Sequence, residues 1–288
     1  MLTLQAPAKI NLTLEVLNRR LDGFHEIRSV IQTIGLYDSL RFRLSGKLRF
    51  SCDNPDVVPE ESLISRAAAL LQQTTGCFRG ATIEINKRIP FASGLGGDSS
   101  DAAAILRGLN QLWQLGLSLA ELTELAPRLG ADVAFFFYGG TALIEGRGER
   151  ITPLPPLPHR WVVLLMPPLP RMAEKTRQLY ASLKPEHYTD GQISEKLVSV
   201  LNEGREFKPS MLFNTFENVA FEFFSELKVY KEHFIKLGAS RVYLAGSGPA
   251  LFTLVKDKAQ AEGIYRNLQQ QGLESYLADM LVSAEQVE

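Results

Sequence analysis

The sequence predicts a protein of mixed α and β structure, either α+β or α/β, in two domains. Segments that alternate apolar and polar residues are interleaved with segments that repeat apolar residues at helical spacing. The 288 residues correspond to two domains at about 150 residues each. Residues 153–158 include four prolines, which do not fit inside a helix or strand. We therefore expect a first domain at residues 1–156 and a second at residues 157–288.

The first half of the chain contains the more strongly patterned elements. Residues 10–17 alternate between apolar and polar side chains, which predicts a strand with one buried face. Residues 101–113 place large apolar side chains on one face of a helix. The other elements predicted here are extended segments at 29–36 and 39–50, helices at 62–73 and 119–129, and strands at 81–85 and 133–138.

The second half begins with a predicted buried strand at residues 161–166, because six consecutive apolar residues end at a Pro-Pro pair. The remaining predicted elements are helices at 174–183, 193–201, 216–237 and 259–271, and strands at 241–244 and 250–255. This order of strands and helices does not distinguish α+β from α/β.

Composition and charge exclude several classes of protein. Hydrophobic residues make up 45% and charged residues 22%, as in globular proteins and unlike disordered or fibrous ones. The net charge of −1 gives no general attraction to nucleic acid or to an anionic membrane. The two cysteines and four histidines are too scattered for a protein-built metal site. We expect a cytoplasmic protein with reduced thiols and no membrane span.

Residues 90–100 form the most informative segment. Three glycines let the backbone approach a ligand closely, and the segment leads into the predicted helix at 101–113. Because a helix N-terminus presents free N–H groups and a positive partial charge, the segment predicts a phosphate site. It matches neither the Walker A pattern nor GxGxxG. On these residues alone the chemistry stays open, and a simple helix cap is the alternative.

The same segment resembles the phosphate loop of the GHMP kinase superfamily. Residues 6–12 (APAKINL), 20–26 (RLDGFHE) and 129–133 (LGADV) are similar to segments of the 4-diphosphocytidyl-2-C-methyl-D-erythritol kinase family. Residues 214–217 (NTFE) and 245–249 (AGSGP) are similar to its later motifs. These matches keep the family's order along the chain, and the combination of the first three is specific to this kinase family.

The resemblance implies a two-domain α+β GHMP kinase fold. The N-terminal domain would resemble ribosomal protein S5 domain 2, the C-terminal domain would be ferredoxin-like, and the active site would lie in the cleft between them. ATP would phosphorylate the 2-hydroxyl of 4-diphosphocytidyl-2-C-methyl-D-erythritol in the non-mevalonate isoprenoid pathway. Mg²⁺ would come with the nucleotide, with no protein ligand assigned. The chain would be a monomer or a weak homodimer. Another GHMP kinase or decarboxylase, or a non-catalytic nucleotide-binding homologue, are the alternatives.

Two residues take catalytic roles through this resemblance. Lys9 would stabilise the charge on the transferred phosphoryl group, and Asp132 would be the general base for the substrate hydroxyl. On the residues alone, Lys9 is more simply a solvated strand start, and Asp132 is either a turn residue or a base.

The resemblance also implies binding residues. Asn11, on the same strand face as Lys9, would bond the substrate or Asp132. The other expected substrate-binding residues are Phe24, His25, Thr176 and Tyr180. The expected ATP-binding residues are Lys87, Pro90, Phe91, Ala92, Ser93, Gly94, Leu95, Gly96, Gly97, Asp98, Ser99 and Ser100.

The chain departs from the family pattern in a few places. Asp98 stands where the family has glycine, and we expect its carboxylate to point away from the nucleotide. An approach through Mg²⁺, or weak ATP binding, are the alternatives. Ala134 replaces proline, Phe24 replaces tyrosine and Ser62 replaces asparagine. None of these changes removes an expected catalytic group.

Overall fold

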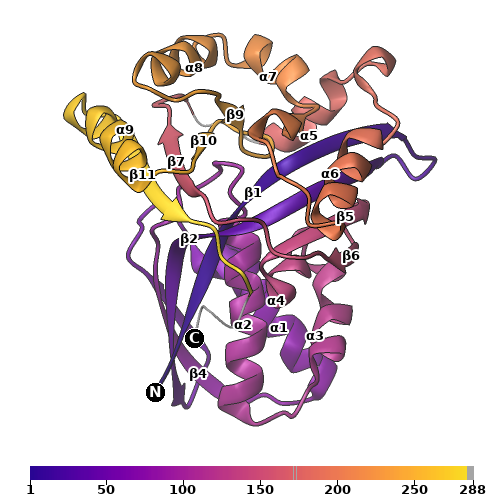
Figure 1. The fold of residues 1–288 in the computed structure, drawn as a ribbon. Coiled ribbons are helices and arrows are strands. Elements are labelled where there is room, and N and C mark those ends of the chain that lie inside the picture. Colours follow the sequence, from indigo (N-terminus) through magenta and orange to yellow (C-terminus); the bar gives the residue numbers. More distant parts are fainter. Residues whose placement is uncertain (171, 173, 284–288) are drawn as a thin grey trace.

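The computed structural model describes residues 1–170, 172 and 174–283, which form two α+β parts packed on one another (Figure 1). The first part is built on a sheet in the order β3-β4-β2-β1-β8, with β5 paired to β2 and β6 to β5. Its strands are β1 (Leu2–Arg19), β2 (His25–Ser45), β3 (Arg49–Cys52), β4 (Gly80–Asn86), β5 (Thr141–Gly146), β6 (Arg150–Pro153) and β8 (Phe213–Asn214). Its helices are α1 (Leu63–Thr75), α2 (Gly97–Trp113), α3 (Leu119–Leu125) and α4 (Phe135–Tyr138), with 3-10 helices at Pro59–Glu61 and Ala126–Arg128.

The second part is built on an antiparallel sheet in the order β11-β7-β10-β9. Its strands are β7 (Trp161–Met166), β9 (Tyr243–Leu244), β10 (Leu251–Val255) and β11 (Glu274–Asp279). Its helices are α5 (Lys175–Ser182), α6 (Gln192–Asn202), α7 (Glu217–Phe223), α8 (Leu227–Lys236) and α9 (Lys258–Gln270), with 3-10 helices at Pro185–His187 and Pro209–Met211. Helices connect β7 to β9 and β10 to β11, which is the ferredoxin-like arrangement expected for this region.

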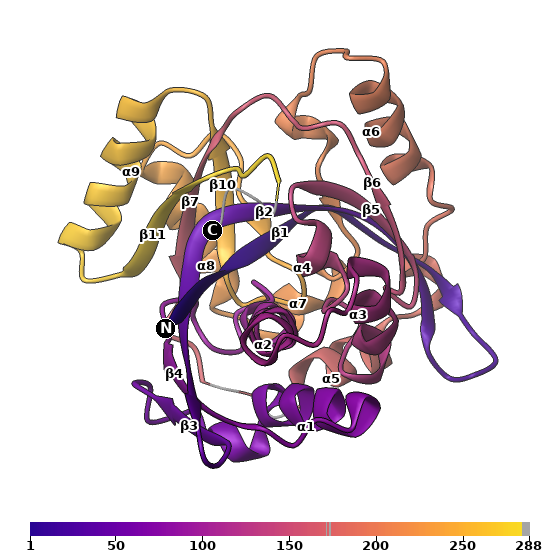
Figure 2. The same cartoon turned by 90° about the horizontal axis from the view of Figure 1, so that it is seen from below.

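Strands β1 and β2 form a long antiparallel hairpin that runs from the first part along the second (Figures 1 and 2). The sequence predicts one buried face for β1, but residues 6–16 are buried without interruption. Helix α2 packs against the two strands within the first part. Farther along the hairpin, Ile10 and Ile34 share an apolar cluster with Leu164 and Phe252 of the second part. Layers on both sides therefore bury the polar positions of β1 as well as the apolar ones.

Further contacts tie the end of the described chain to the first part. The Leu281 N–H donates to the Thr33 carbonyl oxygen at 3.0 Å. Strand β8 lies beyond the predicted domain boundary, yet it pairs with β1 of the first sheet. The boundary after residue 156 therefore stays a prediction.

Some elements differ from the sequence prediction. Residues 133–138 were expected as a strand, but they form a turn and then helix α4, because a short apolar run suits a buried helix equally well. The helix expected at 216–237 is divided into α7 and α8, since Phe224 leaves helical geometry at φ −119° and ψ 79°. The sequence analysis does not predict strands β5, β6 and β11.

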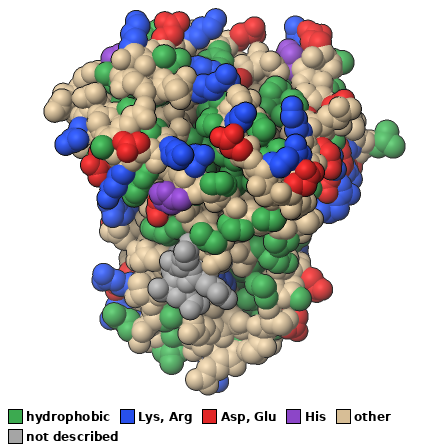
Figure 3. Space-filling view, in the orientation of Figure 1, with side chains coloured by type: hydrophobic (Ala, Val, Ile, Leu, Met, Phe, Trp, Pro, Cys, Tyr) green, Lys and Arg blue, Asp and Glu red, His purple; other side chains and the backbone are tan. Residues whose placement is uncertain are grey.

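The remaining expectations concern the surface and the thiols. Cys52 and Cys77 are both free cysteines. Among the described residues, none of the helices combines the length and the apolar composition that a membrane span requires. On the face shown in Figure 3, side chains of both charges are interspersed, in keeping with the net charge of −1.

Candidate active site

Lys9 and Asp132 come together from distant parts of the sequence. Lys9 lies within β1 and is only 5% exposed. Its ammonium nitrogen lies 3.5 Å from a carboxylate oxygen of Asp132, whose side chain is 39% exposed in the turn before α4. A buried cation therefore faces a carboxylate that a substrate can reach.

A hydrogen-bonded chain holds the Lys9 side chain in place. The Lys9 ammonium donates to Asn11 Oδ1 at 2.8 Å. The Asn11 amide donates to Ser29 Oγ at 2.9 Å, and Ser29 donates to the Thr13 carbonyl oxygen at 2.6 Å. Asn11 thus forms hydrogen bonds with both Lys9 and Ser29, and this chain from β1 to β2 fixes the orientation of the Lys9 ammonium.

The predicted phosphate loop lies directly beside Lys9. The Lys9 N–H donates to the Leu95 carbonyl oxygen at 2.9 Å. Gly94 and Gly96 have left-handed backbones, with φ of 89° and 76°. A Cβ at Gly94 would lie 2.0 Å from the Ala245 carbonyl oxygen, and one at Gly96 would lie 3.0 Å from Lys9 Cγ. Both positions therefore need glycine. The N–H groups of residues 97–99 at the start of α2, which have no acceptor within the helix, follow immediately.

The serines of the loop differ in their surroundings. Ser93 is buried, and its hydroxyl donates to the Pro90 carbonyl oxygen at 2.7 Å, which braces the loop from within. Ser99 is partly exposed in the first turn of α2. Ser100 Oγ is buried, and among the described residues it has no hydrogen-bond partner.

Lys87 lies in a buried charge cluster beneath the first turn of α2. Its ammonium donates to Asp38 at 2.6 Å and to Asp101 at 2.7 Å, and its side chain is 2% exposed. Burial disfavours the ammonium, but the two carboxylates outweigh burial and raise the pKa of Lys87. Burial raises the pKa of Asp101. The half-exposed carboxylate of Asp98 lies 3.9 Å from the same ammonium, so Asp98 is turned toward Lys87.

His25 and Tyr180 stack on one another. Their ring centroids are 4.8 Å apart and their planes differ by 20°. His25 begins β2 and Tyr180 lies on α5, so the stack joins the hairpin to the second part. Burial and then the charge on Asp132 raise the pKa of Tyr180, so the stack lies within electrostatic reach of the Lys9–Asp132 pair.

The two other expected substrate residues neighbour this stack in sequence and make different contacts. Phe24 is 56% exposed, and its ring lies under the Arg147 guanidinium, 4.8 Å from the ring centroid. The Thr176 hydroxyl shares a 2.9 Å hydrogen bond with the Ser247 hydroxyl. Thr176 therefore contacts the glycine-rich segment at residues 245–249.

Lys175 is a buried residue that the sequence analysis does not select. It begins α5, is 8% exposed, and its ammonium donates to the Ala92 carbonyl oxygen at 2.7 Å. Burial and then the charge on Lys9 lower the pKa of Lys175 to about 8. A lysine at a helix start carries no sequence signal of burial.

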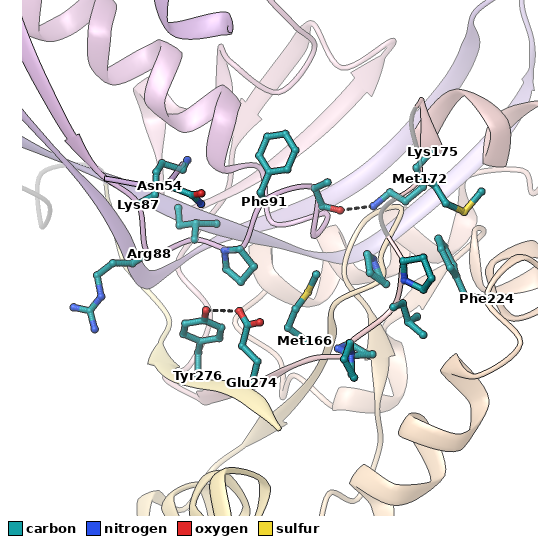
Figure 4. A pocket seen from close by; sticks show the side chains of 18 residues that line it. Asn54, Lys87, Arg88, Phe91, Met166, Met172, Lys175, Phe224, Glu274 and Tyr276 are labelled. Carbon is teal, nitrogen blue, oxygen red and sulfur yellow. Dashed lines mark hydrogen bonds between the residues drawn. The ribbon is translucent and has the colours of Figure 1, made fainter. Parts of the chain in front are cut away.

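A pocket of about 290 Å³ lies beside the phosphate loop. Residues 87–92 line one side and residues 166–170 another, with Lys175 and Tyr276 among the other contributors (Figure 4). The pocket is close to the lower end of the usual size for a small-molecule site. The loop contributes residues 90–92 to the pocket, and its Leu95 carbonyl oxygen contacts Lys9. The loop therefore borders both the pocket and the Lys9–Asp132 pair.

Comparison with known proteins decides the family. The chain matches the models of the GHMP kinases N terminal domain at residues 62–140 and GHMP kinases C terminal at residues 196–273. A 4-diphosphocytidyl-2-C-methyl-D-erythritol kinase of Dehalococcoides mccartyi is 51% identical over 98% of this chain and 99% of its own length. The chain belongs to the 4-diphosphocytidyl-2-C-methyl-D-erythritol kinase family of GHMP kinases.

Other members of the GHMP kinases agree with this assignment. The Geobacillus kaustophilus member of the same kinase family is 40% identical over 93% of this chain and 92% of its own length. A crystal structure of a 4-(cytidine 5'-diphospho)-2C-methyl-D-erythritol kinase superposes with a TM-score of 0.82 at 34% identity, covering 97% of this chain and 99% of that one. The mevalonate kinase of L. major, at 15% identity and a TM-score of 0.73 over 98% and 96% of the two chains, shares the fold alone. The expected two-domain GHMP kinase fold is confirmed.

Proposed function

We propose that this GHMP kinase transfers the γ-phosphoryl group of ATP to the 2-hydroxyl of 4-diphosphocytidyl-2-C-methyl-D-erythritol, in the non-mevalonate isoprenoid pathway. The observation that carries the proposal is the 3.5 Å pairing of Lys9 and Asp132 directly beside the glycine loop. Relatives that are 51% and 40% identical bear the name of this activity.

In the proposed reaction, Asp132 is the base and Lys9 stabilises charge. The substrate oxygen bonds to the γ-phosphorus, the bond from that phosphorus to the bridging oxygen of ADP breaks, and the hydroxyl proton passes to Asp132. Because an alcohol is a far weaker acid than a carboxylic acid, the proton moves late, as the new bond forms. The buried Lys9 ammonium stabilises the phosphoryl oxygens more than an exposed lysine would.

The neighbouring elements would position the two reactants. The loop and the first turn of α2 would hold the phosphates of ATP, and the adjoining pocket of about 290 Å³ would take its nucleoside. The cytosine of the acceptor would stack on the His25–Tyr180 pair, which is worth about 1–3 kcal/mol by analogy with other base–aromatic contacts. Phe24 and Thr176 remain proposed contacts of the acceptor.

We propose that Mg²⁺ comes with the ATP phosphates. Within the described part of the chain, no group of three or more His, Cys, Asp or Glu residues is placed to hold a metal ion. The Ser100 hydroxyl in the first turn of α2 is buried without a hydrogen-bond partner among the described residues, and we propose that a phosphate or its ion supplies that partner when ATP binds. When bound, the ion neutralises charge on the phosphates.

An acceptor comparison tests the proposal. ATP consumption is measured with 4-diphosphocytidyl-2-C-methyl-D-erythritol, mevalonate or homoserine, and phosphorus NMR locates the new ester. We expect turnover with the cytidine-linked acceptor alone and a phosphate on its 2-oxygen. Turnover with another acceptor alone would identify a different GHMP kinase, and ATP binding without turnover would identify a non-catalytic homologue. We also propose a cytoplasmic monomer or weak homodimer, which cell fractionation and sedimentation would test.

A further inference from the structure

Lys175 is a buried cation whose hydrogen-bonding capacity is mostly unused. Among the described residues, its ammonium has one hydrogen-bond partner, the Ala92 carbonyl oxygen at 2.7 Å, and no ion pair with a carboxylate. An ammonium has three N–H donors, so two have no acceptor within the part of the chain that the structure describes. A buried charge in this condition is costly unless a ligand supplies the missing partner.

The charges around Lys175 make its lack of an anion more pronounced. Lys9 is a second buried cation whose field reaches Lys175. The N-terminus of α5, where Lys175 lies, adds a positive partial charge that disfavours a lysine. The preceding Glu174 is exposed and pairs with Arg177 at 3.0 Å. The local electrostatics therefore favour the binding of an anion beside Lys175.

The position of Lys175 indicates which anion it could bind. Its partner Ala92 belongs to the phosphate loop and has a left-handed backbone with φ of 54°. Lys175 also lines the pocket of about 290 Å³ beside that loop (Figure 4). The other charged side chains of this pocket are Lys87, Arg88 and Glu274, and the Tyr276 hydroxyl donates to Glu274 at 2.6 Å. Because Asp38 and Asp101 already pair with Lys87, the lining charges left over are those of Arg88 and Lys175 against the one carboxylate of Glu274.

We propose that Lys175 binds a phosphate oxygen of a reactant through its two unused N–H donors, while the third holds the Ala92 carbonyl oxygen. The ligand chemistry is a phosphoanhydride, supplied either by ATP or by the diphosphate of the acceptor. The second source rests on the proposed function, and the first requires only that the chain bind ATP.

Three variants of the full chain test this role. Lys175→Met keeps the side-chain length and removes the charge, Lys175→Arg keeps the charge, and Lys184→Met removes a lysine whose side chain is 68% exposed. Calorimetry measures the affinity for ATP and for the cytidine-linked acceptor separately at pH 7. Lys175→Met is expected to lower the affinity for one of the two ligands by about tenfold or more without lowering the melting temperature of the protein. Lys175→Arg restores most of that affinity, and Lys184→Met changes neither ligand.

The pH dependence separates ligand binding from a structural role. The wild-type affinity for the affected ligand falls as pH rises through about 8, where Lys175 loses its proton, and Lys175→Met lacks this fall. Unchanged affinity for both ligands in Lys175→Met would overturn the proposal, even with full kinase activity. The proposal would also be overturned if Lys175→Met lowered the affinity for both ligands equally and lowered the melting temperature. If the chain lacks the proposed activity but Lys175→Met still loses ATP affinity, the proposed function fails and this inference stands.

Discussion

Replacing Lys175 with methionine is expected to stabilise the folded chain at neutral pH. Burial and the charge on Lys9 lower the pKa of Lys175 from 10.5 to about 8, so the charged form is less favourable in the folded chain than in the unfolded one. This penalty is complete below pH 8. It disappears as the pH rises toward 10.5, because the lysine is then neutral in both states.

The magnitude follows from the two pKa values. The difference between 10.5 and about 8 corresponds to about 3 kcal/mol, at about 1.36 kcal/mol for each pH unit. Removing the ammonium also leaves the Ala92 carbonyl oxygen without its donor, which costs about 1–2 kcal/mol. We therefore expect Lys175→Met to raise the free energy of unfolding by about 1–2 kcal/mol at pH 7. This advantage falls by about 2–3 kcal/mol by pH 10.

Urea unfolding at pH 7 and pH 10 measures both quantities, with Lys184→Met as the matched exposed control. The slope of the free energy against urea must stay constant for the comparison to hold. The reasoning would be refuted if Lys175→Met were less stable than the wild type at pH 7. It would also be refuted if the difference in the free energy of unfolding between the two chains were the same at pH 7 and pH 10. Either result would mean that the ammonium carries no penalty in the folded chain.

Two further variants test the loop and the aromatic stack. Gly94→Val places a Cβ 2.0 Å from the Ala245 carbonyl oxygen. Enzyme kinetics is expected to show that it raises the KM for ATP about tenfold or more. Gly263→Ala, whose Cβ meets nothing within 4 Å, is the control. An unchanged KM in Gly94→Val would mean that the loop does not need this glycine. Tyr180→Ala is expected to raise the KM for the acceptor by about 5- to 150-fold and to leave the KM for ATP nearly unchanged. Parallel increases in both KM values would argue against a stacking role.

The sequence predicts best those elements whose pattern is set locally. The apolar spacing of α2 and the uninterrupted apolar run of β7 are visible without a structure. The run at residues 133–138 is ambiguous, because packing against the rest of the core, rather than periodicity, makes it helical. Strand β11 pairs with β7 across a long sequence separation, and its own six residues have only a weak alternation.

The same distinction applies to the site. On the residues alone, Lys9 is most simply a solvated strand start, and only the layers on both sides of β1 make it 5% exposed. The family motifs therefore supply the pairing of Lys9 with Asp132, which local spacing does not contain. Lys175 lacks even that signal, because its hydrogen-bond partner Ala92 lies 83 residues away in the sequence.

The central claim is that Asp132 takes the substrate proton while the loop holds ATP independently of it. The most direct measurement compares kcat and the Kd for ATP in Asp132→Asn and in the wild-type chain. We predict that kcat falls by about 10²- to 10⁴-fold, while the affinity for ATP stays close to that of the wild type. Near-normal turnover in Asp132→Asn would contradict the account.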